Sequence, residues 1–308
     1  MLKKKLSKKI TDKPYSMRTN GITQSLLSTW CQCPRKALFK VNRWEGFKRD
    51  TTNFGTLVHN VLEKLYLNKS VINNNNTTTT TTKVLGKWID ETESDAISAI
   101  KAMVIMVNYV KLYKSDFTTK KFEQVEQKFD IPFFGFRLLG KIDGVYRDKS
   151  GKLWIIEHKT KSQINEDDLM LKLSFDFQNL FYIICTELIY DEPVQGVLYN
   201  VIRNPAHRQG KGQSIMDFQK KLQVEIDKDH SHFFMRYEIP YTQKQKDYFQ
   251  MELNEKLNAM NNQIEGGKLA YKVQGACSSP FKCEFLNACS SDTMTGYSQK
   301  KELFSELK

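Results

Sequence analysis

Long apolar runs are absent from this sequence. No stretch of its 308 residues approaches the roughly 18 consecutive apolar residues that a membrane-spanning helix needs. The basic start of the chain is not followed by an apolar run of the signal-peptide type. We therefore expect a soluble intracellular protein, located in the cytoplasm, with no membrane partner.

Cysteine is also scarce, and the positions of the cysteines argue against a disulfide framework. The chain has six cysteines, and without evidence of secretion clustered thiols favour a metal or cluster site over a disulfide framework. Cys185 lies in an apolar run, so we expect it in the core. The other five lie near the two ends of the chain: Cys31, Cys33, Cys277, Cys283 and Cys289.

Basic residues outnumber acidic ones, and the excess is uneven. There are 47 Lys and Arg against 35 Asp and Glu, a formal net charge of +12, which favours a polyanionic partner such as DNA. Residues 1–50 alone carry 13 basic and 3 acidic side chains. We expect a basic arm over residues 1–20, although a lysine tail that merely aids solubility explains residues 3–9 equally well.

Apolar periodicity predicts helices in the first third of the chain. Thr23 is expected to cap a helix that Pro34 bends or interrupts, and Asn53 to cap a second helix. The Asn/Thr tract over residues 73–82 is of low complexity and predicts a solvated insertion, taken as residues 70–83, between helices.

The period then changes from helical to strand-like, which indicates the fold class. The predicted order of helices and strands fits an α/β protein with a mixed central sheet flanked by helices, followed by a cysteine-rich segment. We expect a single domain over residues 21–290, with the cysteine segment at 270–290 and a polar tail at 291–308. The expected strands are 125–131, 136–146, 153–157 and 196–202, and the expected helices are 86–113, 166–189 and 212–264.

Two carboxylates and a lysine are expected to meet on two of these strands. Asp143 and Glu157 lie on strands that the turn 148–151 joins, so both can reach one hard cation. Lys159 follows Glu157 by two residues and projects from the same face. This arrangement suits phosphodiester hydrolysis, in which Mg²⁺ activates water and Lys159 orients or deprotonates that water or stabilises the transition state. The alternative is an exposed hairpin on which Asp143, Glu157 and Lys159 are ordinary surface charges, and this alternative would explain most chance occurrences of the D...ExK pattern.

The order of motifs resembles the RecB-like branch of the PD-(D/E)XK nuclease superfamily, specifically its iron-sulfur members, which include AddB-type and CRISPR-adaptation nucleases. The resemblance covers residues 23–289 and implies a restriction-endonuclease-like fold. The motifs that carry it are Cys33-Pro34-Arg35-Lys36, Gly55-Thr56-Leu57-Val58-His59, Gly140-Lys141-Ile142-Asp143-Gly144, Glu157-His158-Lys159 and the pair Gln178 and Tyr182.

The resemblance assigns roles to residues that would otherwise be unremarkable. It implies that His59 joins the two carboxylates at Mg²⁺ or Mn²⁺, and that the main-chain carbonyl of His158 adds an oxygen ligand. Gln178 and Tyr182 lie four residues apart, share a helix face and would line the DNA side of the site. Glu126 is either a supporting acid or a solvent-facing strand residue.

The terminal cysteines suggest a second cofactor. A 4Fe-4S cluster needs four thiolates, and Cys277, Cys283 and Cys289 need one more, from Cys33 or Cys31. We favour Cys33 because it precedes proline as in the family, and such a cluster would join the N-terminal helices to the C-terminal segment. In the family, two residues separate the middle pair of cluster cysteines, whereas five residues separate neighbouring C-terminal cysteines in this chain. Zinc is the alternative metal, and cysteines without a ligand are the other alternative.

The sequence therefore predicts a metal-dependent deoxyribonuclease, more an exonuclease than an endonuclease, acting in DNA recombination, repair or replication. Its substrate would be single-stranded DNA or a duplex with an end. Because the helicase motif G-x-x-x-x-G-K-[ST] is absent, any unwinding would come from a separate helicase. The alternatives are a catalytically silent DNA-binding subunit of a nuclease-helicase complex and a zinc-stapled scaffold.

Overall fold

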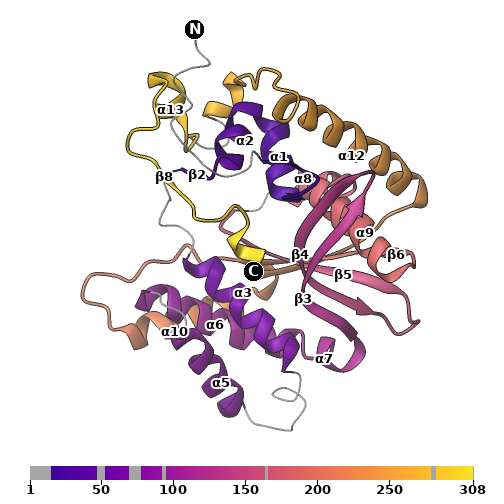
Figure 1. The fold of residues 1–308 in the computed structure, drawn as a ribbon. Coiled ribbons are helices and arrows are strands. Elements are labelled where there is room, and N and C mark those ends of the chain that lie inside the picture. Colours follow the sequence, from indigo (N-terminus) through magenta and orange to yellow (C-terminus); the bar gives the residue numbers. More distant parts are fainter. Residues whose placement is uncertain are drawn as a thin grey trace. The chain divides into compact units, whose positions relative to one another are not determined.

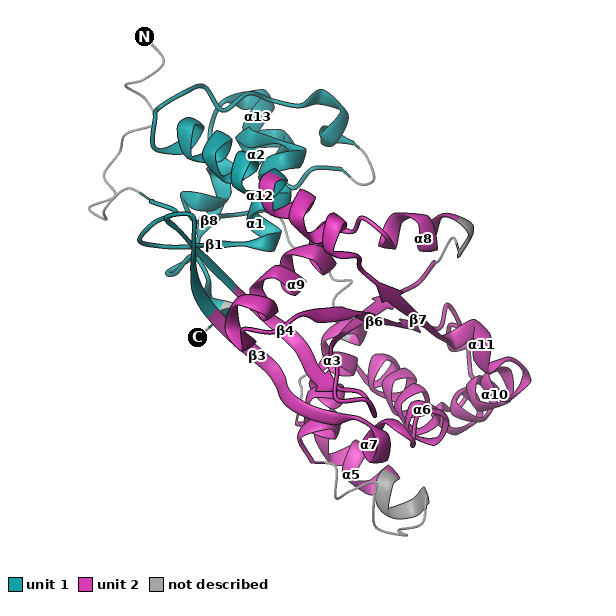
Figure 2. Cartoon of the chain, turned by 90° about the vertical axis from the view of Figure 1, so that its right-hand side faces the viewer, with its two compact units in different colours: residues 1–48, 130–139, 252–308 teal, residues 49–129, 140–251 magenta. Residues whose placement is uncertain are grey.

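The chain forms two compact units (Figure 2). The computed structural model describes residues 15–46, 53–68, 78–91, 95–163, 166–278 and 282–307. Unit 1 comprises residues 1–48, 130–139 and 252–308, and unit 2 comprises residues 49–129 and 140–251. Each unit is therefore assembled from segments that are distant in the sequence.

Unit 2 contains a mixed sheet, which confirms the predicted fold class. Strand β4 (Phe136–Arg147) pairs antiparallel with β5 (Leu153–Lys161), and β5 pairs parallel with β6 (Val194–Arg203). Strand β7 (Phe234–Pro240) closes the row antiparallel to β6, and β3 (Lys121–Phe133) pairs with β4. The parallel β5–β6 pair requires a crossover connection, which helices supply.

Helices cover both faces of this sheet (Figure 1). Helix α9 packs against β5 and β6, whereas α3, α5, α6 and α10 pack on one another and α3 contacts β5. The helices of this unit are α3 (Asn53–Leu67), α5 (Thr78–Asp90), α6 (Ala96–Leu112), α7 (Asp116–Thr119), α8 (Glu166–Leu173), α9 (Phe177–Tyr190), α10 (Ile215–Lys228) and α11 (His230–Phe233). Helix α12 (Gln243–Ile264) begins in unit 2 and ends in unit 1.

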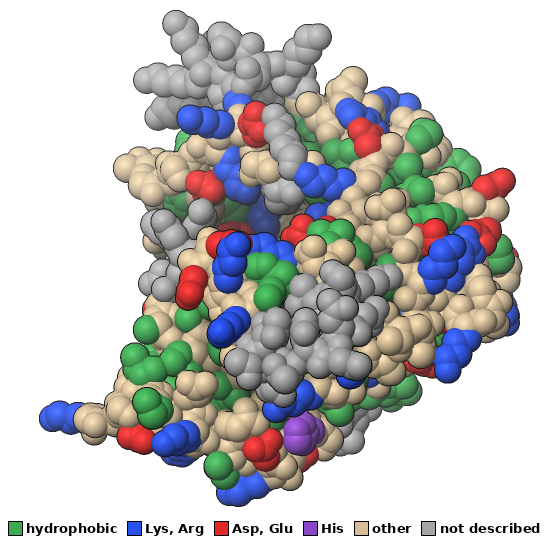
Figure 3. All heavy atoms as spheres, turned by 90° about the horizontal axis from the view of Figure 1, so that it is seen from below, with side chains coloured by type: hydrophobic (Ala, Val, Ile, Leu, Met, Phe, Trp, Pro, Cys, Tyr) green, Lys and Arg blue, Asp and Glu red, His purple; other side chains and the backbone are tan. Residues whose placement is uncertain are grey.

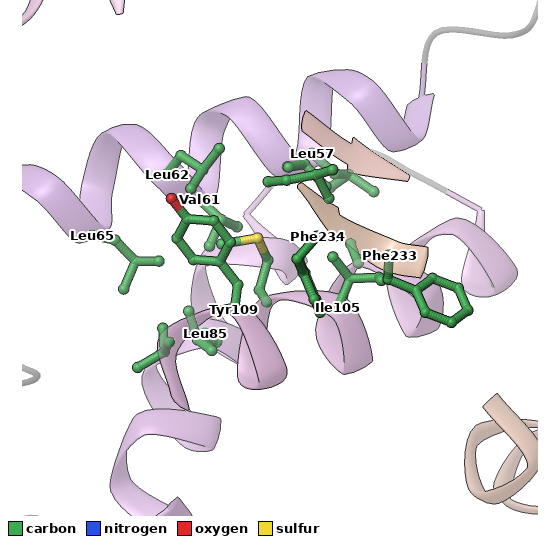
Figure 4. Packing of buried hydrophobic residues seen from close by; sticks show 14 of the residues in the cluster. Leu57, Val61, Leu62, Leu65, Leu85, Ile105, Tyr109, Phe233 and Phe234 are labelled. Carbon is green, nitrogen blue, oxygen red and sulfur yellow. The ribbon is translucent and has the colours of Figure 1, made fainter. Parts of the chain in front are cut away.

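The main core of unit 2 lies between these helices. Figure 4 shows side chains of α3, α5, α6 and the α11–β7 segment packed together, among them Leu62, Tyr109 and Phe234. The spacing of apolar residues along α3 turns one face of the helix inward, as the sequence predicts. Leu57, Val61, Leu62 and Leu65 are at most 1% exposed.

Unit 1 begins with a helix pair whose break the sequence predicts. Thr23 caps α1 (Gln24–Gln32) by accepting a hydrogen bond from the Leu26 N–H at 3.2 Å. Cys33 has extended backbone, and Pro34 opens α2 (Pro34–Val41) at its first position, where its missing N–H has no intrahelical partner to lose.

The rest of unit 1 is built from short elements. Phe39 of α2 packs with Phe285 and Ala288 in a small core beside Cys283 and Cys289. The elements are β1 (Ile22–Thr23), parallel to the start of β4; β2 (Trp44–Glu45), antiparallel to β8 (Ser298–Gln299); α13 (Leu286–Ser291); and the 3-10 helices Gln274–Cys277 and Ser305–Leu307.

Several predicted boundaries are wrong. The region 212–264 contains β7, whose short segment is flanked by helices and is held by pairing with β6. The expected helix 166–189 breaks before Asp176, which caps α9, and the expected helix 86–113 breaks before Asp95, which caps α6. Asn53 is the first residue of α3 in place of its cap.

The Asn/Thr tract is only partly an insertion. Helix α5 begins at Thr78, inside the tract, although threonine is a modest helix former. Burial of Leu85 and Ile89 later in the helix offsets this preference. Residues 70–77 of the expected insertion, and residues 1–14 of the expected basic arm, lie outside the described residues. Within the described ranges no helix is long and apolar enough to cross a membrane.

The core of α3 can be tested with two leucines. Leu62 is 1% exposed and Leu67, on the same helix, is 58% exposed. Leu62→Ala should lower the free energy of unfolding by about 2–5 kcal/mol because it leaves a cavity, and Leu67→Ala should change it by no more than about 0.5 kcal/mol. Urea denaturation measures both, and equal losses would contradict the packing of α3.

Candidate active site

The end of the β4–β5 pairing brings Asp143 close to Glu157. Gly144 pairs with Ile156 as the last pair of the antiparallel ladder, and Asp143 and Glu157 are the next residues of the two strands. The second carboxylate oxygen of Asp143, Oδ2, accepts a hydrogen bond from the main-chain N–H of His158 at 2.8 Å. The two carboxylates predicted from the sequence are therefore neighbours in the structure.

Glycines beside Asp143 allow this close approach. A Cβ added to Gly144 would lie 2.7 Å from Ile156 on β5, and one added to Gly140 would lie 2.3 Å from the Phe129 ring on β3. Both distances are too short for a real Cβ, so a side chain at either position would push the strands apart. The turn after β4 is held by Asp148, whose carboxylate accepts from the backbone of Ser150 and Lys152.

Glu157 is buried, 3% exposed, and half of its carboxylate is occupied. Its Oε1 accepts from the Lys159 ammonium and from the Gln178 amide at 2.7 Å, and Lys159 also donates to Gln178 Oε1 at 2.9 Å. Its Oε2 is buried with no hydrogen-bond partner among the described residues. The structure thus brings Gln178 of α9 together with Glu157 and Lys159 of β5.

Burial dominates the protonation of this group. Desolvation, with smaller effects from nearby charges, raises the pKa of Asp143 to about 6, and desolvation and the Asp143 charge raise the pKa of Glu157 to about 7. For Lys159, burial acts to lower the pKa, but the carboxylates of Glu157 and Asp143 outweigh it and raise the pKa to about 12. Lys159 is therefore a cation at neutral pH.

His59 and Tyr182 border the carboxylates. Burial lowers the pKa of His59 although the Glu157 charge opposes it, so the imidazole is neutral at pH 7, the form that binds metals. Tyr182 of α9 has its pKa raised by burial and then by Glu157, and its ring meets the Phe129 ring edge-on at 6.2 Å. Its hydroxyl therefore stays protonated.

Two further predicted residues have other partners. The His158 side chain faces Asn200, with 2.7 Å between His158 Nδ1 and Asn200 Nδ2, and only its backbone contacts Asp143. Glu126 pairs with Lys141 and has a positive φ of 52°, a left-handed conformation within β3. Its charge still acts on His59 and Asp143.

The carboxylate pair fits a divalent cation. Within the described residues no group of three or more His, Cys, Asp or Glu side chains has the arrangement of a metal site. However, two buried carboxylates with raised pKa values and a free oxygen at Glu157 Oε2 are the chemistry that a hard cation such as Mg²⁺ or Mn²⁺ satisfies. Asp143 and Glu157 therefore fit such an ion.

The cysteines lie in two places. Cys185 is fully buried in α9, as predicted for a core residue. In unit 1, Cys283 and Cys289 both pack against the small core described above, and burial raises the pKa of Cys289, with contributions from Cys283 and Cys33. The fourth predicted thiol belongs to the same segment, because the Cys283 N–H donates to the carbonyl of Cys277 at 2.8 Å. Cys31 is exposed on α1.

Sequence reasoning missed two polar residues beneath the carboxylates. Asn200 is fully buried on β6, and Arg236 of β7 donates to its Oδ1 at 2.9 Å. Asn200 interrupts the otherwise apolar stretch 196–202, and a buried polar residue in such a strand is a signal that could have found it. No such signal marks Arg236, because its strand was taken as helix.

The raised pKa values predict how the stability of metal-free protein depends on pH. The folded chain keeps protons on Asp143 and Glu157 up to about pH 6 and about pH 7, whereas the unfolded chain releases them near the ordinary values of 3.8 and 4.5. Stability should therefore be greatest below pH 4 for these groups and fall as pH rises to 7.

Replacing Glu157 by Gln should reduce this pH dependence. A tenfold difference in proton affinity corresponds to about 1.4 kcal/mol, so Glu157→Gln should unfold less readily than the unaltered protein at pH 8 in EDTA. Urea denaturation between pH 5 and 8 measures this, with Glu255→Gln, an exposed residue of α12, as control. Parallel curves for both variants and the unaltered protein would contradict the burial of Glu157.

Comparison with known proteins fits this geometry. The sequence profile of the PD-(D/E)XK nuclease superfamily matches residues 22–290. A candidate exonuclease from Eubacterium rectale has a similar structure, with 13% identity, coverage of 97% of this chain and 98% of that chain, and a TM-score of 0.51. At this identity the likeness concerns the fold alone.

Other comparisons add little. The structure of SSO0001 is 12% identical, with coverage of 88% of this chain and 96% of that chain, but its TM-score of 0.31 carries no conclusion. A search of curated proteins finds no match. The superfamily profile, in contrast, spans most of the sequence and includes both carboxylates, the lysine and His59. The chain therefore belongs to the PD-(D/E)XK nuclease superfamily.

Proposed function

We propose that the chain is a metal-dependent deoxyribonuclease in which Asp143, Glu157 and Lys159 form the catalytic centre. The observation that carries this proposal is the pair of buried carboxylates on β4 and β5 with a cationic lysine beside them. In this superfamily such a group serves phosphodiester hydrolysis.

Asp143 and Glu157 would hold Mg²⁺ or Mn²⁺, with the His59 imidazole and the main-chain carbonyl of His158 as further ligands. The bound ion would supply Lewis-acid stabilisation of the phosphate charge and a more acidic water. Asp143 is already oriented by the His158 N–H, and Glu157 by the amide of Gln178. The chain thus fixes both carboxylates before an ion arrives.

Lys159 would act as a fixed positive charge. The carboxylates of Glu157 and Asp143 raise the pKa of its ammonium, so it can hydrogen-bond the attacking water or the phosphate as a cation. Gln178 accepts from Lys159 and donates to Glu157, which sets the distance between them. Tyr182 would present a protonated hydroxyl toward the DNA.

DNA is the polyanion that the net charge of +12 favours. On the face seen in Figure 3, Lys and Arg side chains are interspersed with Asp and Glu and do not form one continuous patch, so the carboxylate site locates the reaction better than overall charge does. We propose exonuclease action on single-stranded DNA or duplex ends, in recombination, repair or replication, with a separate helicase for any unwinding.

Cleavage is tested with end-labelled and circular DNA in Mg²⁺ or Mn²⁺. Asp143→Asn, Glu157→Gln and Lys159→Ala should each reduce the rate by orders of magnitude, and combining them should add little because they act as one unit. Lys228→Ala, an exposed lysine of α10, is the control and should cleave normally. Unaltered cleavage by Lys159→Ala would exclude this centre, and rapid cleavage of circles would indicate an endonuclease.

We also propose that Cys33, Cys277, Cys283 and Cys289 hold a 4Fe-4S cluster, as in the iron-sulfur members of the RecB-like branch. Support comes from the proximity of Cys33 and Cys283 to Cys289, and from the backbone link between Cys283 and Cys277. Cys31, exposed on α1, is the weaker candidate for the fourth ligand. Zinc in the same thiolates is the alternative.

The cluster is tested by metal analysis of protein purified without oxygen. About four irons per chain are expected, with loss of iron and colour in Cys33→Ser and Cys289→Ser and none in Cys31→Ser or Cys185→Ser. Because the cluster would close a very long loop, its loss should also lower the melting temperature. Stoichiometric zinc without iron would exclude the iron-sulfur proposal and leave the nuclease proposal unaffected.

A further inference from the structure

A row of polar side chains crosses the sheet directly behind the carboxylates. His158 pairs with Asn200 in the β5–β6 register, and Asn200 pairs with Arg236 in the β6–β7 register. Directly opposed residues share a face of the sheet, and neighbouring residues on a strand point to opposite faces. These three residues therefore lie on the face opposite Glu157 and Lys159.

Hydrogen bonds run along this row. Arg236 Nε donates to Asn200 Oδ1 at 2.9 Å, which leaves the Asn200 amide group to donate to His158 Nδ1 at 2.7 Å. Asn200 is fully buried and His158 is 3% exposed. Since His158 Nδ1 accepts, the imidazole carries its proton on Nε2, which is buried and lacks a partner among the described residues.

Arg236 is anchored at the far end of the row. Its guanidinium forms an ion pair with buried Asp116 at 2.6 Å, donates to the Tyr109 hydroxyl at 2.8 Å and lies 3.3 Å from the centre of the Tyr113 ring. Asp116 also accepts from Lys120 at 2.7 Å. A buried network of this kind is rigid, because breaking any link leaves a buried charge or polar group unpaired.

The near end of the row reaches the metal-binding residues through the backbone. The His158 N–H holds Asp143 Oδ2, and the residues on either side of His158 are Glu157 and Lys159. Tyr66 of α3 stacks on the His158 ring, with 5.5 Å between ring centres and 25° between ring planes. Fixing the His158 ring between Tyr66 and Asn200 therefore fixes the stretch of β5 that carries the site.

We infer that Asn200 and Arg236 are positioning residues for the divalent-metal site, acting through the His158 side chain. This inference rests on the proposed function, because it assumes that Asp143 and Glu157 bind the ion. Residues that orient metal ligands from behind typically contribute about 10–100-fold to metal affinity. Asn200 should therefore change how tightly the ion binds while touching neither ion nor DNA.

The test is Mn²⁺ binding to DNA-free protein, measured by electron paramagnetic resonance or calorimetry. Asn200→Ala should weaken binding about 10–100-fold, shift the midpoint of the metal dependence of cleavage by a similar factor, and leave cleavage at saturating metal near normal. The matched control is Asn108→Ala, because Asn108 is 1% exposed in the same unit and exchanges two hydrogen bonds with Gln223. A purely structural loss would affect both variants alike.

A second variant keeps the inference testable if Asn200→Ala does not fold. Arg236→Lys retains a cation for Asp116 but lacks the planar guanidinium that reaches Asn200 through Nε and Asp116 through Nη2. It should therefore weaken Mn²⁺ binding in the same direction. Equal Mn²⁺ affinity in the unaltered protein and in folded Asn200→Ala or Arg236→Lys would overturn the inference. Mn²⁺ binding that Glu157→Gln and Asp143→Asn do not weaken would instead overturn the proposed function.

Discussion

The antiparallel pairing of β4 with β5 is the constraint on which the rest of the site depends. It brings the carboxylates of Asp143 and Glu157 together away from solvent. Burial disfavours their charged forms and so raises the pKa of both. Two adjacent buried carboxylates lower the stability of the fold unless a metal ion neutralises them. The large apolar core between the helices supplies the stability that offsets this cost.

Much of this arrangement could be predicted from the sequence. The change from helical to alternating periodicity located β3 to β6, and the turn at Asp148 joined the right two strands. The spacing of Asp143, Glu157 and Lys159 then put three charged groups on one face, because side chains two apart on a strand point the same way. The spacing of residues along the chain was therefore sufficient for features that depend on the geometry of a single strand or turn.

The remainder depends on contacts between distant segments, which local pattern does not report. Strand β7 is short and lies between helices, and its pairing with β6 defines it. Arg236 and Asn200 are 36 residues apart, so their hydrogen bond could not be expected before β7 was known. Likewise, the sequence does not show that the His158 side chain lies against Asn200 of β6.

Because side chains alternate between the two faces of β5, insertions and deletions have different consequences in the strand and in the turn of this hairpin. Arg147 and Leu153 pair at its end, beyond which the turn is open to solvent and can vary in length without moving the strands. Removing one residue inside β5 would exchange the two faces for the residues beyond the deletion, turning Glu157 toward Tyr66 of α3 and His158 toward Gln178 of α9. Relatives of this chain should therefore differ in length at the turn and keep the length of the strand.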